Sequence, residues 1–123
     1  MIRIDLLSTV PLYDQIKAGL RGLVARGLLR PGDPAPSIRS LAAELKVNPN
    51  TVARAFRELT LEGFFEAQRG EGNVIASGAL RQAKDKLSGV RENLKESIRL
   101  ARRGGLPWSE IDALTREARR EEP

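Results

Sequence analysis

Residues 37–59 read Ser-Ile-Arg-Ser-Leu-Ala-Ala-Glu-Leu-Lys-Val-Asn-Pro-Asn-Thr-Val-Ala-Arg-Ala-Phe-Arg-Glu-Leu and contain two short helical patterns separated by a tight turn. In both patterns the apolar residues recur at the i, i+3, i+4, i+7 spacing of a helix with one buried face. The positions predicted to be buried are Ile38, Leu41, Ala42 and Leu45 in the first helix, and Val52, Ala55, Phe56 and Leu59 in the second. Two amphipathic helices joined by so short a turn are typical of a helix-turn-helix.

The turn between the two helices contains a helix-start signal. The side-chain oxygen of Asn48 can accept a hydrogen bond from a free N–H group of the second helix, and Pro49 suits the first helical position. Asn48, Asn50 and Thr51 therefore lie at the exposed start of that helix. In a helix-turn-helix this end reads base edges in the major groove, so the pattern predicts a contact with double-stranded DNA.

A β-hairpin is predicted directly after the second helix, which we expect to end near Gly63. Residues 64–69 and 73–76 are strand-like runs, and the glycines at positions 70 and 72 make the turn between them. Glycine permits positive φ and a close approach to another surface. A hairpin in this position is the wing of a winged helix, and its tip would lie against the phosphate backbone or the minor groove.

The residues before the helix-turn-helix predict one more helix and a turn. The helix should begin near Pro11 and end with Gly27 as its C-terminal cap, and residues 31–34 (Pro-Gly-Asp-Pro) form a turn. Its predicted apolar face consists of Leu12, Ile16, Leu20, Leu23 and Val24. Ile2 and Ile4 alternate with charged residues, which is compatible with a short strand or an extended arm. Tyr13 is expected in the core.

A long helix is predicted from about Ala79 to Arg103, after a domain boundary at Ser77-Gly78. A last short helix follows, with Ser109 as its cap and Trp108 packed against the long helix. Apolar residues on the long helix are spaced alternately by three and four, close to a heptad seam. The predicted interface residues are Leu80, Ala83, Leu87, Val90, Leu94, Ile98 and Ala101, with Leu114 from the last helix. This seam could pack back on the winged domain. The simpler way to bury so long an apolar stripe is a symmetric second copy of the chain.

The predicted fold is therefore mainly α with a small β-hairpin. Residues 1–76 form a winged helix-turn-helix domain and residues 77–123 a two-helix dimerisation segment. Two helices bury too little to enclose a metabolite within one subunit, so any effector pocket would lie between subunits, and the identity of an effector is unknown.

Composition argues against an enzyme. The 123 residues include neither cysteine nor histidine, which removes the usual nucleophile–base pairs and zinc ligands, so no metal or other cofactor is expected. The net charge of +5 suits a nucleic-acid partner. However, residues 1–76 hold 10 basic and 8 acidic residues, so the placement of a few cations matters more than their total.

The sequence also predicts a cytoplasmic protein. No apolar run approaches the roughly 18 residues of a membrane span, and the first residues lack the apolar stretch of a secretory signal. The absence of cysteine fits a reducing compartment.

Taken together, these motifs resemble the GntR family of bacterial transcription regulators, and the short C-terminal part resembles its YtrA subfamily. The similarity covers roughly residues 10 to 76. The matching pieces are residues 11–16 (PLYDQI), 27–33 (GLLRPGD), 36–42 (PSIRSLA), 47–52 (VNPNTV), 55–59 (AFREL), 62–63 (EG) and 70–72 (GEG). The resemblance implies a repressor that binds a palindromic operator as a homodimer, often next to an operon for an ABC transporter.

The family resemblance also implies which residues contact DNA. They are the arginine of the Pro-Ser-x-Arg motif, the start of the recognition helix and the glycine-bearing wing tip. With the arginines that follow on the helix and beside the wing tip, the candidates are Ser37, Arg39, Asn48, Asn50, Thr51, Arg54, Arg57, Arg69, Gly70 and Gly72. Relatives often have a basic or hydroxyl residue where Pro49 stands, so readout should shift toward Asn50, Thr51 and Arg54. Ala35 replaces a leucine that is common in relatives, and this should only slightly reduce packing contacts.

Some of these candidates have ordinary alternatives. Asn48 is expected to serve mainly as a cap, and Arg57 could pair with Glu58 or Glu62 instead of DNA. For the whole chain, the alternative function is a winged-helix module that binds another protein without recognising specific DNA.

Overall fold

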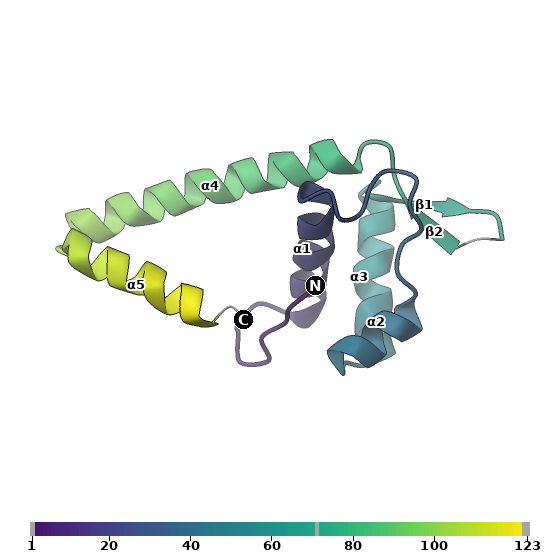
Figure 1. The fold of residues 1–123 in the computed structure, drawn as a ribbon, viewed down its shortest axis with the longest axis horizontal. Coiled ribbons are helices and arrows are strands. Elements are labelled where there is room, and N and C mark those ends of the chain that lie inside the picture. Colours follow the sequence, from purple (N-terminus) through teal and green to yellow (C-terminus); the bar gives the residue numbers. More distant parts are fainter. Residues whose placement is uncertain (1, 71, 122–123) are drawn as a thin grey trace. The chain divides into compact units, whose positions relative to one another are not determined.

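The computed structural model describes residues 2–70 and 72–121, and Figure 1 shows its ribbon. The elements, in chain order, are α1 (Leu12–Ala25), α2 (Ile38–Leu45), α3 (Pro49–Leu61), β1 (Phe65–Gln68), β2 (Gly72–Ile75), α4 (Ala79–Arg103) and α5 (Trp108–Glu121). The fold is mainly helical with one antiparallel hairpin, as predicted. Glu71, in the middle of the predicted wing tip, lies outside the described residues.

The core of the first part of the chain lies among α1, α2, α3 and the hairpin. Both helices of the helix-turn-helix bury the predicted apolar faces, although Ile38 and Leu45 are only half-buried. Phe56 of α3 packs edge-on against Phe65 of β1, with ring centroids 5.1 Å apart. Because the core is largely aliphatic, this aromatic pair adds a directional contact that fixes α3 against the hairpin.

The helices α1, α2 and α3 end in left-handed caps. Gly27 and Gly63, predicted near the ends of α1 and α3, have φ of +76° and +77°. After α3 the N–H of Phe64 donates to the carbonyl of Leu59 at 2.9 Å, which closes a Schellman motif. The same arrangement ends α2, but with Lys46 at φ +57° in place of glycine. The turn of the helix-turn-helix therefore contains a side chain in a conformation that costs a non-glycine residue energy.

The wing is held by a third segment that the sequence predicted only as a turn. β1 and β2 pair antiparallel, with Phe65 opposite Ile75. On the other side of β2, the N–H of Ile75 donates to Asp33 at 2.9 Å and the N–H of Ala35 donates to Asn73 at 2.9 Å. Residues 32–35 thus run alongside β2 and anchor the base of the wing to the chain that enters α2.

The N-terminal residues form an extended arm rather than a strand. Ile2 and Ile4 are partly buried against the core. The side chain of Gln15 accepts from the N–H of Asp5 at 2.7 Å and donates to the Asp5 carbonyl at 3.0 Å. Gly19 makes room for the arm, because a Cβ there would lie 2.6 Å from Cγ2 of Ile2.

The chain divides into two compact units between Asp85 and Lys86, inside α4 and beyond the boundary predicted at residue 77. The difference arises because Ala79 and Ala83 belong to the first unit's core. Ala83 is only 1% exposed, so its own chain already covers a residue that we predicted in a dimer interface. Leu80 also packs partly against that core.

The second unit contains the rest of α4 and α5. α5 begins at Trp108, two residues earlier than a cap at Ser109 implies, so Ser109 lies within its first turn rather than capping it. The guanidinium of Arg102 lies 4.7 Å from the centre of the Trp108 ring and donates to the Leu106 carbonyl at 3.2 Å. Trp108 therefore contacts a side chain of α4 as expected, but 56% of it remains exposed.

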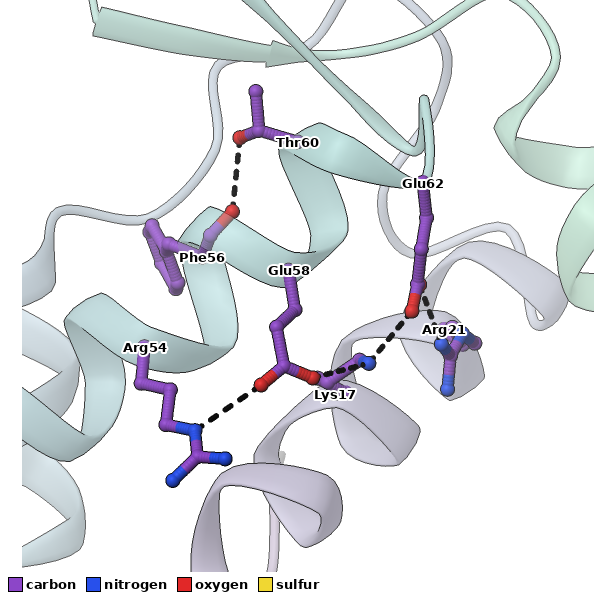
Figure 2. Close-up of polar contacts among 7 residues, drawn as sticks. All are labelled: Lys17, Arg21, Arg54, Phe56, Glu58, Thr60 and Glu62. Carbon is purple, nitrogen blue, oxygen red and sulfur yellow. Dashed lines mark hydrogen bonds and ion pairs between the residues drawn. The ribbon is translucent and has the colours of Figure 1, made fainter.

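A network of charged side chains joins α1 to α3, and Figure 2 shows its members. Lys17 of α1 is 7% exposed, and its ammonium donates to Glu58 at 2.9 Å and to Glu62 at 2.7 Å. Glu62 also accepts from Arg21 at 2.8 Å. A lysine this deeply buried keeps its charge only when it is paired.

The pKa values of the network shift in the direction that pairing dictates. Burial would lower the pKa of Lys17, but hydrogen bonds from its ammonium to Glu62 and Glu58 outweigh burial and raise that pKa above 10.5. The hydrogen bond from Lys17 lowers the pKa of Glu58 below 4.5. Burial would raise the pKa of Glu62, but Lys17 and Arg21 outweigh it and lower that pKa below 4.5.

We predict that Lys17→Met lowers the free energy of unfolding at pH 7 by about 1 to 3 kcal/mol, because two carboxylates lose a common partner. Since Glu58 and Glu62 have lowered pKa values, the stability they contribute is present above pH 4.5 and is lost as the pH falls through the folded-state values. Urea unfolding between pH 7 and pH 3 should therefore show a shallower decline for Lys17→Met than for the wild type.

Lys95→Met is the matched control. Lys95 pairs with Glu92 at 3.6 Å on the exposed surface of α4 and should change stability by no more than about 0.5 kcal/mol. Equal losses in the two variants would show that burial does not strengthen the Lys17 network.

Candidate DNA-binding surface

The first turn of α3 is built by the residues of the preceding turn. Asn48 has an extended backbone, and its Oδ1 accepts from the N–H of Asn50 at 2.8 Å, which makes it the N-cap. Pro49 occupies the first helical position, and the N–H of Thr51 donates to the Asn48 carbonyl at 2.9 Å. The capping role expected for Asn48 is confirmed. Asn48 and Asn50 are both exposed.

The outward face of α3 follows from its buried face. Val52, Ala55, Phe56 and Leu59 turn into the core, so the opposite side of the helix faces solvent. Asn50, Arg54 and Arg57 are exposed there, and Thr51 is half-buried. Ala53 shares this face and was not among the predicted site residues. Alanine has no polar group to signal a binding role, but its helical position between Asn50 and Arg57 could have identified it.

The start of α2 contributes the two predicted residues of the Pro-Ser-x-Arg motif. Ser37 is the N-cap, and its Oγ accepts from the N–H of Ser40 at 3.0 Å. Arg39 follows within the first turn and is exposed. Among the described residues, Arg39 and Arg57 have no salt-bridge partner. Both guanidinium groups are therefore available to an external anion, and Arg57 does not form the pair with Glu58 or Glu62 that we considered.

An open groove brings three elements together. It is lined by Ile38, Ala53, Phe56, Arg57, Thr60, Leu61 and Asn73. A neighbouring hollow is lined by Ala35, Pro36, Ser37, Ile38, Phe56, Gly72 and Asn73. Because the two hollows share Ile38, Phe56 and Asn73, the start of α2, the side of α3 that carries Ala53 and Arg57, and the first two residues of β2 border one region.

The wing tip has the backbone that the sequence predicted. Gly70 and Gly72 have φ of +79° and +74°, which a side chain would strain. Arg69, the last residue before this turn, is exposed. The tip therefore combines a narrow glycine turn with a neighbouring cation.

Arg54 is placed differently from the other candidates. It is on the outward face of α3, but its Nε donates to Glu58 at 3.2 Å and its guanidinium carbon lies 3.7 Å from the centre of the Tyr13 ring. Tyr13 is half-buried and contacts both the core and this guanidinium. Arg54 is thus held by two groups of its own domain.

The fold and this surface define a DNA-binding winged helix-turn-helix of the kind found in transcription regulators. Residues 12–75 match the family model described as bacterial regulatory proteins, gntR family. The chain is also 36% identical over 118 residues to the HTH-type transcriptional repressor YtrA of Bacillus subtilis, covering 95% of this chain and 91% of that protein. The chain therefore belongs to the GntR family and is a transcription regulator rather than an enzyme, as predicted.

Solved structures agree with this assignment. YtrA from Sulfolobus acidocaldarius, a GntR-family transcription factor, matches with a TM-score of 0.60 at 37% identity, covering 80% of this chain and 97% of that one. The DNA-binding domain of AraR in complex with operator ORX1 matches with a TM-score of 0.54, covering 60% of this chain and 92% of that one. At 24% identity the AraR match concerns the fold.

Across residues 2–70 and 72–121, no helix combines the length and the apolar character that crossing a bilayer requires.

We predict that the two roles of Asn48 can be separated by substitution. Asn48→Ala removes the cap and should lower stability by about 1 kcal/mol, whereas Asn48→Asp keeps a cap acceptor and should retain stability. Asn48→Asp nevertheless adds a negative charge at the start of α3, so it should weaken DNA binding. Thermal unfolding and DNA titration of both variants test this. If Asn48→Asp bound DNA as tightly as the wild type, the start of α3 would not be near the phosphates.

Proposed function

We propose that the protein is a repressor that binds a palindromic operator as a homodimer. One observation supports this most directly: the first turn of α3 carries exposed polar residues, and the later turns of the same helix line hollows that the start of α2 and the wing strand β2 also line. A helix that enters the major groove between a preceding helix and a wing needs this arrangement. AraR, which shares the fold, was solved with its operator, and the B. subtilis relative is named a repressor. Such a protein would act in the cytoplasm.

Each part of the surface has a distinct task in this proposal. Asn50, Thr51 and Arg54 would read base edges, since they lie on the outward side of the first turns of α3. Arg39 and Arg57 would bind phosphates, because neither has an ion-pair partner among the described residues. The wing tip, with Arg69 beside it, would contact the backbone or minor groove and help to set the register of the domain on the duplex.

Dimerisation is proposed from the uncovered apolar residues of the second unit. Leu87, Val90 and Leu94 of α4 are 48%, 59% and 60% exposed, and they recur at alternating spacings of three and four. A second copy of α4 would cover this stripe as in a two-stranded coiled coil. Ile98, Ala101 and the exposed Leu114 of α5 would extend the same interface. Ala83 is left out because it is already buried, and any effector is unidentified.

The DNA proposal is tested with fluorescence anisotropy on the DNA upstream of the protein's own gene. Binding should be tight, should exceed that for a scrambled duplex, and should weaken steeply as salt rises. Arg39→Ala should weaken operator binding about 5-fold to 100-fold while leaving the thermal unfolding midpoint unchanged. Arg99→Ala, which removes an exposed arginine of α4, is the control.

Two outcomes would contradict the proposal at different levels. Equal affinity for operator and scrambled DNA would defeat specific recognition, and stable capture of a protein without any DNA binding would favour an interaction module. Unchanged affinity for Arg39→Ala would remove only that residue from the site.

The dimer is tested with Leu94→Glu and its neighbour Asn93→Glu. A charge placed on the apolar stripe should halve the mass measured by light scattering and weaken operator binding, because two linked domains bind better than one. The same charge at Asn93, about 100° around the helix, should leave the dimer intact. A Leu94→Glu variant that remained dimeric would show that this stripe is not the interface.

A further inference from the structure

Arg54 is held at one end and open at the other. Its Nε donates to Oε2 of Glu58 at 3.2 Å, and its guanidinium lies over the Tyr13 ring, 3.7 Å from the centroid. Its side chain nevertheless remains 54% exposed. Figure 2 shows the Nε contact, with the two terminal nitrogens beyond it. Among the described residues, Nη1 and Nη2 of Arg54 have no hydrogen-bond partner.

The free end of Arg54 has the chemistry of a base reader. A guanidinium has five N–H groups in a planar fork, and using the Nε group leaves four on the terminal nitrogens. Two parallel N–H groups from such a fork match the O6 and N7 acceptors that guanine presents in the major groove. Adenine presents one acceptor and one donor at the corresponding positions, so it cannot accept both bonds.

The groups that hold Arg54 are themselves held. The second oxygen of Glu58 accepts from Lys17 at 2.9 Å, and Lys17 also bonds Glu62, which accepts from Arg21. Tyr13 lies on α1, the helix that also contributes Lys17 and Arg21. The orientation of the Arg54 guanidinium is therefore set by α1, through a ring on one side and a carboxylate on the other. Less rotamer freedom then remains to be lost on binding.

The surroundings favour a base over a phosphate as the acceptor. A phosphate next to Arg54 would also lie close to the Glu58 carboxylate, which repels it. Arg54 is four residues after Asn50, one turn further along the same outward face, where a groove-bound helix continues past the bases read by its first turn.

We propose that Arg54 reads a guanine in each half of the operator and that Tyr13 and Glu58 are its positioning residues. This rests on the proposed function, since it requires α3 to enter the major groove. It goes further by naming the base, its acceptor atoms and the residues outside the contact surface that determine the preference.

The test is selection of bound sites from a randomised pool of duplex DNA, followed by sequencing. The proteins compared are the wild type, Arg54→Lys, Tyr13→Leu and Tyr13→Phe, with Arg99→Lys of α4 as the matched control for an arginine-to-lysine change. Arg54→Lys keeps the charge but loses the fork, so it should lose a guanine preference at one position per half-site while general DNA affinity remains. Tyr13→Leu should weaken the same guanine preference. Tyr13→Phe, which keeps the ring, should retain the preference of the wild type. Thermal unfolding of each variant establishes that it is folded.

A second measurement identifies the acceptor atom. Replacing that guanine by 7-deazaguanine removes N7 and should weaken wild-type binding roughly fivefold or more, while leaving Arg54→Lys almost unchanged.

The outcomes separate this inference from the proposed function. If the wild type selects no sequence, specific operator binding fails, and this inference fails with it. If the wild type selects a motif that Arg54→Lys selects equally well, Arg54 does not read a base, although operator binding stands. If Arg54→Lys changes the motif but Tyr13→Leu does not, Tyr13 has no positioning role. A uniform loss of affinity in Arg54→Lys without a change of motif would assign Arg54 to a phosphate.

Discussion

The packing of α3 against α1 in the first unit depends on the buried ammonium of Lys17. Its two partners are Glu58, in the last turns of α3, and Glu62, the C-cap residue that follows the helix. Because they lie four residues apart on one side, pairing the charge restricts the rotation of α3 about its own axis as well as its distance from α1. A nonpolar contact would tolerate some rotation, because apolar side chains have no preferred direction. The two hydrogen bonds do not tolerate it, and Glu58 transmits the constraint to Arg54. The face that α3 turns to solvent is therefore set from α1, by residues that lie away from the exposed surface.

A second constraint aligns the other parts of the surface with that face. Residues 32–35 bond to β2 and lead directly into the Ser37 cap of α2, so the wing and the start of α2 are connected through backbone hydrogen bonds. The edge contact between Phe56 and Phe65 then links the hairpin to α3. These links explain why groups separated by 35 residues, such as Ser37 and Gly72, line the same hollow. The wing is therefore joined by backbone hydrogen bonds to the segment that leads into the helix-turn-helix.

The long helix α4 contributes residues to both compact units. In its first turns, the small residues Ala79 and Ala83 fit into the core of the first unit. Further along, larger apolar residues such as Leu87 and Leu94 remain exposed. The apolar side of α4 is thus packed against its own chain in the first turns and exposed further along. In the dimer that we propose, a second copy of the chain would cover only the later part.

Local pattern by itself determined the elements, because helix periodicity, Asn48 as a cap and glycines at helix ends and in the wing act within a few residues of each other. It also identified the family, since the motifs are short and contiguous. Only the tertiary structure decided which polar side chains are already engaged: Arg54 and Arg57 look alike in the sequence, but the partners of Arg54 come partly from α1, about forty residues away. The pairing of residues 32–35 with β2 and the burial of Ala83 were likewise invisible, because both depend on segments that approach one another only after the core has formed.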